Sequence, residues 1–215
     1  GDEIQRARRI ARAGLVHQIG ADGVDQRGAV KSKLQQRGFC PADLNVTLPL
    51  PDKDFDLVIS VEGIEHLENV HVFLRECHRI LRDNGLLIVT TPNIVSLRSR
   101  VRFMGSGFFH KDPMPLNESS RHPLHHIGLR TFQQLRYDLH TLGFRLLDVS
   151  CTHIKPVSFL YVLFVPWMWL YTLIAFRKEK DPAQRKRNRE ILQALYSMPL
   201  LFGENLLLVA KKGIR

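Results

Sequence analysis

The stretch that decides the fold is 55-FDLVISVEGIEHL-67. Residues 57–61 are apolar or small without alternation, which is typical of a strand covered on both faces in a parallel sheet. A glycine then lets the backbone turn, and Glu62, Glu65 and His66 follow at the carboxyl end of the strand. Open α/β sheets bind ligands at this end of their strands. We therefore expect a crevice lined by two carboxylates and an imidazole.

The segments around this stretch alternate between helix and strand patterns. Toward the N-terminus we expect a helix over 3–13, a weak strand over 15–24 and a short basic helix over 28–36. Toward the C-terminus we expect helices over 70–81 and 131–142, the latter with a Thr131–Gln134 capping box, and strands over 86–90, 144–151 and 205–210. This alternation indicates a doubly wound α/β sheet in one domain that spans residues 1–215.

Composition narrows the partners that this domain can attract. The formal net charge of +10 predicts an anionic partner, such as nucleic acid, a lipid headgroup surface or a phosphorylated substrate. The 3 cysteines are far apart and odd in number, which argues against a disulfide framework and favours a reducing compartment. The apolar content of 44% is enough for a real core.

Two segments depart from the alternating pattern. Residues 94–123 are rich in Gly, Pro and Arg, and we interpret them as an irregular lid or substrate loop. Residues 153–203 form an insertion before the last strand, in which an uncharged run over 157–176 is followed by a basic run over 177–189 and a second apolar patch. A helical hairpin or a helix lying on an anionic membrane surface fits this composition. A buried helix pair that caps the domain is the alternative.

The ordered series of motifs resembles the class I S-adenosylmethionine-dependent methyltransferase family. It comprises ADLN at 42–45, FDLV at 55–58, EGIEHL at 62–67, FLRE at 73–76, GLL at 85–87 and TPN at 91–93. The resemblance implies a Rossmann-like, mostly parallel sheet with an antiparallel last strand. It also implies S-adenosyl-L-methionine as cofactor. The family's glycine-rich loop has no counterpart here beyond Gly1, so we expect the chain to lack the first strand and most of that loop.

The resemblance assigns cofactor contacts by position. Asp25 would accept hydrogen bonds from the ribose hydroxyls, because a carboxylate offers paired acceptors to a diol. The remaining contacts are Gly1 in the glycine loop, Asp43 and Leu44 at the adenine, and Ser60, Val61 and Glu62 at the methionine end. For Asp25 and Asp43 the alternative is a solvated turn residue.

The acidic and histidine side chains allow two chemical roles. Methyltransferases of the ubiquinone pathway and of small RNAs use a Glu-x-x-Glu-His motif to hold a divalent metal, which here implies Glu62, Glu65, His66 and His126 as ligands. Such a metal would lower the pKa of a substrate hydroxyl. Without metal, His66 would line the substrate pocket or act as a base, and His126 would share that catalytic role. A surface position for His125 and His126 is the alternative.

Together these features predict a methyltransferase that acts on an oxygen of a lipid-linked or glycan-like small-molecule acceptor. We expect it in the cytoplasm, peripheral or monotopic at an anionic membrane surface. An RNA 2′-O-methyltransferase is a second hypothesis, although nucleic-acid surfaces use basic and stacking residues rather than a Val, Leu and Phe run. A degenerate, non-catalytic interaction module is a third.

Overall fold

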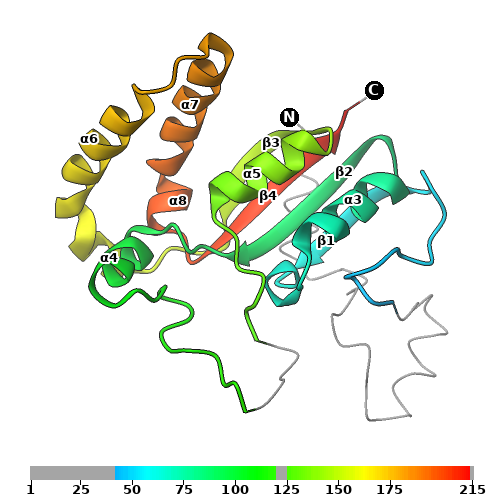
Figure 1. Ribbon diagram of the computed structural model, residues 1–215, viewed down its shortest axis with the longest axis horizontal. Coiled ribbons are helices and arrows are strands. Elements are labelled where there is room, and N and C mark those ends of the chain that lie inside the picture. The colour runs from blue at the N-terminus through cyan, green and yellow to red at the C-terminus, as the bar shows by residue number, and fades with distance from the viewer. Residues whose placement is uncertain (1–41, 120–124, 214–215) are drawn as a thin grey trace.

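The computed structural model describes residues 42–119 and 125–213 and places a four-stranded sheet in order β1-β2-β4-β3 at its centre (Figure 1). The strands are β1 (Phe55–Val61), β2 (Leu81–Pro92), β3 (Phe144–Cys151) and β4 (Asn205–Lys212). β1 pairs with β2 in parallel, and β4 lies antiparallel to both β2 and β3. The predicted sheet, with only its last strand reversed, is therefore confirmed among these four strands.

The helices lie between these strands in the order that the sequence predicts, with additions. They are η1 (Ile64–His66), α3 (Val70–Ile80), α4 (Leu97–Ser106), α5 (Phe132–Thr141), η2 (Pro156–Phe164), α6 (Val165–Phe176), α7 (Pro182–Leu195) and α8 (Met198–Phe202). The expected strand over 15–24 and the expected helices over 3–13 and 28–36 lie outside the described residues, as do Gly1 and Asp25.

α3 and α5 cover one face of the sheet (Figure 1). Asn69 caps α3 by accepting a hydrogen bond from the Val72 amide, and the apolar side of the helix is fully buried. α5 begins with the predicted capping box, in which Thr131 and Gln134 each accept a hydrogen bond from the backbone of the other. Local capping and an apolar stripe therefore suffice to place both helices on the core.

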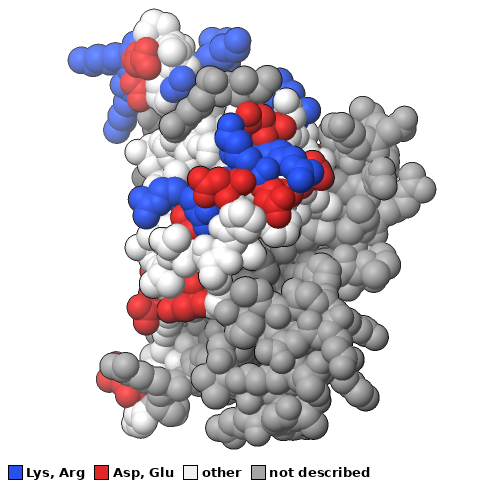
Figure 2. All heavy atoms as spheres, turned by 90° about the vertical axis from the view of Figure 1, so that its right-hand side faces the viewer, with Lys and Arg blue, Asp and Glu red and all other residues white. Residues whose placement is uncertain are grey.

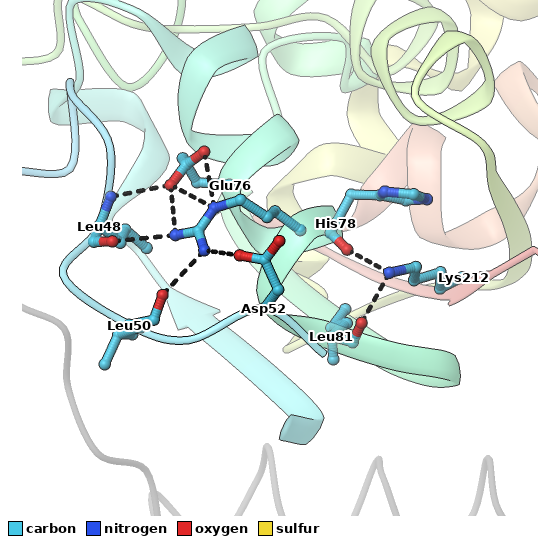
Figure 3. Close-up of polar contacts among 8 residues, drawn as sticks. Leu48, Leu50, Asp52, Glu76, His78, Leu81 and Lys212 are labelled. Atoms are coloured by element: carbon cyan, nitrogen blue, oxygen red, sulfur yellow. Dashed lines mark hydrogen bonds and ion pairs between the residues drawn. The ribbon is translucent and has the colours of Figure 1, made fainter. Parts of the chain in front are cut away.

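A buried ion pair fastens the chain before β1 to α3 (Figure 3). Glu76 accepts hydrogen bonds from the Leu48 amide and from the Arg79 guanidinium, which also donates to the carbonyl oxygens of Leu48 and Leu50. At the same C-terminal end of the helix, Lys212 donates to the carbonyls of His78 and Leu81. Side chains thus satisfy backbone groups that the helix end and the loop leave open.

Acidic and basic side chains interleave on the face of the molecule shown in Figure 2. Exposed ion pairs near the amino end of β1 join Lys53 to Asp83 and Arg82 to Asp56. Pairs of this kind contribute about 0–1 kcal/mol each. Because the charges alternate in sign, the described part of this face offers no continuous surface to an anionic partner.

The segment 94–123 is less irregular than the sequence predicts, because it begins with α4. Ser96 caps this helix by accepting a hydrogen bond from the Ser99 amide, and Gly107 follows its last turn with a φ of 73°. That left-handed conformation favours glycine, so both ends of the helix carry standard signals. A role for the rest of the segment as a lid stays a prediction.

The insertion before β4 is helical, as predicted. α6 and α7 run back along each other and project beyond the end of the sheet (Figure 1). We call η2, α6 and α7 the hairpin. A bridge between Ile154 and Gly203 closes its base, and Gly203 cannot carry a side chain because a Cβ atom would lie 2.3 Å from the Pro199 carbonyl oxygen. Both ends of the insertion therefore leave the same edge of the sheet.

Candidate functional site

Three side chains with atoms that can bind a metal or accept a proton meet at the carboxyl end of β1. Glu65 and His66 lie in η1, directly after the strand, and His126 lies in the segment that leads into α5. One donor atom from each lies within 4.8 Å of the other two. The rings of His66 and His126 are 5.0 Å apart between centroids. We call this group the histidine cluster. The structure thus brings together three residues that the sequence proposes for one site.

Glu65 is the buried member of the cluster. It is 1% exposed, and its Oε2 accepts a hydrogen bond of 3.3 Å from the Thr91 hydroxyl at the end of β2. Burial, which disfavours the charged form, raises the pKa of Glu65 to about 7, although the nearby imidazole of His126 acts in the opposite direction. A carboxyl group with this pKa exchanges a proton readily at neutral pH.

Both imidazoles are oriented through Nδ1. The Nδ1 atom of His66 lies 3.3 Å from the His125 carbonyl oxygen, and that of His126 lies 3.0 Å from Asp112 Oδ1 and 3.1 Å from Oδ2. Because carbonyl and carboxylate oxygens only accept, these contacts favour the tautomers that carry the proton on Nδ1. Nε2 of each ring is then the atom left to accept a proton or to bind a cation.

A glycine lets the histidine-bearing segment approach η1. The Gly128 amide donates a 2.7 Å hydrogen bond to the Glu65 carbonyl oxygen. A Cβ atom at this position would lie 2.4 Å from the Leu67 carbonyl oxygen and 2.7 Å from that of Ile64. Any side chain at Gly128 would therefore push the segment, and His126 with it, away from Glu65.

Glu62 lies beside this cluster rather than within it. Its backbone adopts a φ of 47°, which is uncommon for a residue other than glycine, while its amide donates to the Thr90 carbonyl oxygen. Its Oε1 accepts a hydrogen bond from the side-chain amide of Asn205, and Oδ1 of that amide is buried without a partner among the described residues. Strained backbone and unsatisfied polar atoms concentrate at ligand sites.

The other predicted cofactor residues differ in how they are placed. Val61 is 38% exposed at the end of β1, beside the partly buried Ser60, so both border the expected crevice. Asp43 Oδ1 accepts hydrogen bonds from the backbone and side-chain amides of Asn45, which makes it an Asx-turn residue with one oxygen engaged. Leu44 is 3% exposed and packs in the core, so its side chain is not at an open surface.

The donor set of the histidine cluster suits a divalent cation. One carboxylate and two imidazoles are common ligands for first-row metals, and ligating histidines usually donate their other ring N–H to a carboxylate or a backbone carbonyl. Asp112 and the His125 carbonyl supply those two acceptors. Glu62 is not among the three residues that converge within the described part of the chain.

The sequence misses Asp112 and Asn205 as members of the site. Asp112 precedes His126 in a segment without a recognisable pattern, and Asn205 opens a strand on the far side of the insertion. No spacing rule joins either residue to the motif at 62–66. Only the antiparallel pairing of β4 with β2 brings Asn205 to the carboxyl end of β1.

Part of the chain is similar to known methyltransferases. Residues 6–89 match the family model described as "Methyltransferase domain". A "Probable S-adenosylmethionine-dependent methyltransferase" of Mycobacterium tuberculosis is 51% identical over 49 residues, which cover 23% of this chain and 18% of that protein. A ubiquinone biosynthesis O-methyltransferase of Bradyrhizobium diazoefficiens is 44% identical over 43 residues, which cover 20% of this chain and 17% of that protein.

Solved structures with similar folds are much less alike in sequence. The YcgJ protein from Bacillus subtilis aligns over 90% of this chain and 81% of its own, with a TM-score of 0.45 and 12% identity. A SAM-dependent methyltransferase from Archaeoglobus fulgidus aligns over 76% of this chain and 62% of its own, with a TM-score of 0.40 and 18% identity.

Residues 6–89 are thus similar to the methyltransferase domain family, and the relatives named above are described as S-adenosylmethionine-dependent methyltransferases or O-methyltransferases. S-adenosyl-L-methionine is the cofactor that this similarity implies. The described residues fit the methionine end of this cofactor. The Glu62 carboxylate and the unpartnered Oδ1 of Asn205 are acceptors that suit the cofactor's ammonium group. The matched stretches span less than a fifth of the relatives named above, at 18% and 17% of their lengths.

Proposed function

We propose that the protein uses S-adenosyl-L-methionine to methylate an oxygen of a small-molecule acceptor that is lipid-linked or glycan-like and lies at a membrane surface. The observation that carries the proposal is the histidine cluster, in which Asp112 orients His126 at the edge of the sheet beside Glu62. Relatives whose names state ubiquinone biosynthesis O-methylation support oxygen as the methyl acceptor.

The chain's own residues supply positioning and a proton acceptor. S-adenosyl-L-methionine brings a methyl group that is already activated on a sulfonium. Glu62 and Asn205 would hold the ammonium group. His126 would accept the proton of the acceptor hydroxyl at Nε2 while the oxygen takes the methyl group from the sulfonium sulfur, and S-adenosylhomocysteine would be the leaving group. Asp112 lies against Nδ1 and stabilises the imidazolium that forms. A positioned base of this kind contributes about 10²–10⁴-fold in rate.

A divalent metal is a second way in which the same residues would work. Glu65, His66 and His126 would hold it, and it would lower the pKa of the acceptor hydroxyl. A metal on Nε2 of His126 leaves no lone pair there for a proton, so the two roles exclude each other. Metal content measured on the purified full-length protein, before and after Glu65→Gln, decides between them.

The membrane part of the proposal rests on the hairpin. One continuous helical stretch, Pro156–Phe176, has a mean hydropathy of 1.9, yet only 6% of its apolar window is buried. Leu163 is 84% exposed and Leu160 is 74% exposed. A helix that served as part of a soluble core would be mostly buried. Because both ends of the insertion return to one sheet, a hairpin lying in the membrane surface fits better than a single crossing.

Basic residues complete the membrane-facing character of the hairpin. α7 exposes Arg185, Lys186, Arg187 and Arg189 beside the apolar α6. Lysine and arginine near a bilayer are attracted to anionic headgroups at about 1 kcal/mol each. A surface with this much exposed apolar area is a poor match for RNA, which requires stacking and phosphate contacts.

The test uses the full-length protein. Calorimetry with S-adenosylhomocysteine is expected to detect binding, and radiolabelled methyl from S-adenosylmethionine is expected to enter a product that partitions into organic solvent. If S-adenosylhomocysteine does not bind, the enzyme proposal fails. If it binds but the label enters only water-soluble product, methyl transfer survives and the lipid-linked acceptor does not.

Vesicle flotation tests the membrane surface separately. The Leu160→Glu/Leu163→Glu variant is expected to bind anionic vesicles at least about tenfold more weakly, because two leucines lose about 1.5–3 kcal/mol each of burial. Glu68→Gln, on an exposed residue outside the hairpin, serves as the control. Equal flotation of the wild type and the leucine variant would refute membrane contact through the hairpin.

A further inference from the structure

A second polar cluster lies where β4 begins, at the same edge of the sheet as the histidine cluster. The Oε1 atom of Glu204 lies 3.2 Å from Lys111 Nζ, 3.2 Å from Lys155 Nζ and 3.7 Å from His110 Nε2. The Glu204 side chain is 6% exposed, while those of Lys111 and Lys155 are 29% and 45% exposed. Two ammonium groups are thus held around a buried carboxylate and remain open to solvent.

The cluster carries more positive charge than Glu204 neutralises. Burial and the nearby charge of Arg98 lower the pKa of His110 below its ordinary value of 6.5, which favours the neutral imidazole at pH 7. Burial opposes ionisation of Glu204, but hydrogen bonds from Lys155 and Lys111 outweigh it and lower the pKa of this carboxyl. Lys111 and Lys155 therefore face one carboxylate. Each ammonium group has three donors, of which Glu204 uses one.

The position of this cluster links the site to the hairpin. Lys111 directly precedes Asp112, and the Cα atoms of these two residues are about 3.8 Å apart. Asp112 in turn contacts Nδ1 of His126. Glu204 is followed by Asn205, which contacts Glu62. On the other side, Lys155 directly precedes η2, where the exposed apolar surface begins. Members of this second cluster are thus neighbours in the chain of the residues that contact His126 and Glu62, and of the first residue of η2.

We propose that Lys111 and Lys155 bind a phosphate group of the methyl acceptor, whose hydroxyl lies at His126 and whose apolar chain lies along η2. The proposal rests on the proposed function, since it names the acceptor of that site as a phosphate-bearing amphiphile. Lysine and arginine are the usual binders of phosphate oxygens. One lysine is enough to balance the charge of Glu204, so the second lysine leaves a positive charge that a phosphate group can neutralise.

The test compares two double variants of the full-length protein. Lys111→Gln/Lys155→Gln removes two charges from the cluster, and Lys53→Gln/Lys211→Gln removes two from the opposite edge of the sheet. One arm measures the Tm with inorganic phosphate against chloride at matched ionic strength. The other measures flotation with phosphatidylcholine vesicles that contain phosphatidic acid or phosphatidylserine at matched surface charge. Calorimetry with S-adenosylhomocysteine is run on every variant.

Binding of phosphate, free or in the vesicle headgroup, is expected in the wild type and in the Lys53→Gln/Lys211→Gln control. It is expected to fall at least about tenfold in Lys111→Gln/Lys155→Gln, because two charge-assisted hydrogen bonds are lost. A Tm shift with inorganic phosphate identifies free phosphate as a sufficient ligand, whereas a preference for phosphatidic acid alone identifies a lipid headgroup. If both double variants behave as the wild type does in both arms, the proposal is overturned.

Glu204→Gln separates an anion site from a merely structural ion pair. It keeps a hydrogen-bond acceptor but removes the competing charge, so phosphate binding is expected to strengthen several-fold. Unchanged or weaker phosphate binding in a variant that still binds S-adenosylhomocysteine contradicts an anion site. If the wild type does not bind S-adenosylhomocysteine, the proposed function fails. The phosphate measurement would still show whether Lys111 and Lys155 form an anion site.

Discussion

The histidine cluster and the hairpin both border the carboxyl edge of the sheet, but they differ in how far their side chains are buried. In the cluster, a carboxyl is buried against a hydroxyl and two oriented imidazoles. In the hairpin, α6 buries none of its residues, although its sequence is the more apolar. Apolar composition alone therefore does not predict burial. The contrast motivates the proposal that the hairpin's exposed apolar side chains contact a membrane surface.

Substitution of His126 is expected to have the largest effect on the cluster side of this comparison. His126→Ala removes the proposed proton acceptor, so methyl transfer should fall about 10²–10⁴-fold. S-adenosylhomocysteine binding, measured by calorimetry, should be unchanged. His140→Ala, on the exposed side of α5, is the matched control and should retain activity. Full activity in His126→Ala would remove this residue from the chemistry.

Paired leucine substitutions address the comparison directly through stability. Leu139 in α5 is 2% exposed, whereas Leu163 in η2 is 84% exposed. Leu139→Ala should lower the free energy of unfolding by about 2–5 kcal/mol because it leaves a cavity in the core. Leu163→Ala should change it by less than about 0.5 kcal/mol. Urea unfolding measures both. Similar losses in the two variants would mean that the Leu163 side chain packs on protein.

A glycine pair tests how closely the histidine-bearing segment must approach η1. Gly128→Ala should cost about 1–3 kcal/mol and reduce methyl transfer, because its Cβ atom would lie 2.4 Å from the Leu67 carbonyl oxygen. Gly105→Ala in α4 meets nothing within 4 Å and should stabilise that helix by about 0.5–1 kcal/mol. Thermal unfolding and initial rates report the two effects. A harmless Gly128→Ala would show that the segment tolerates displacement.

The smallest expected effect is the pH dependence of the buried pair on α3. The hydrogen bond from Arg79 lowers the pKa of Glu76 below its ordinary value of 4.5. The resulting stabilisation is therefore present above pH 4.5 and is lost as the pH falls through the folded-state pKa. Glu76→Gln should cost about 1–2 kcal/mol at neutral pH and progressively less in acid.

Urea unfolding across that pH range measures the difference between Glu76→Gln and the wild type. Glu68→Gln, on an exposed carboxylate, should show little difference at any pH. A Glu76→Gln deficit that stays constant into the acid range would assign the loss to packing rather than to charge.

The amino-acid sequence by itself determined the local elements and the type of chemistry. The unbroken apolar run of β1, the apolar stripe of α3 and the Thr131–Gln134 capping box depend on neighbours within a few residues, so pattern is enough to predict them. The motif at 62–66 likewise placed two carboxylates and an imidazole after a strand, because η1 keeps them adjacent. α4 escaped prediction because its three arginines and Gly105 resemble a loop, although its caps are local.

Only the tertiary structure decided which of those groups act together. Asp112 reaches His126, and Asn205 reaches Glu62, because segments distant in sequence end at one edge of the sheet. Lys111 and Lys155 likewise converge on Glu204 from two different loops. Pairing of β4 with β2 and β3 fixes that edge, and the hairpin stays outside because its ends are tied to β3 and β4. Long-range strand pairing has no period in the sequence, so residue spacing could not reveal these contacts.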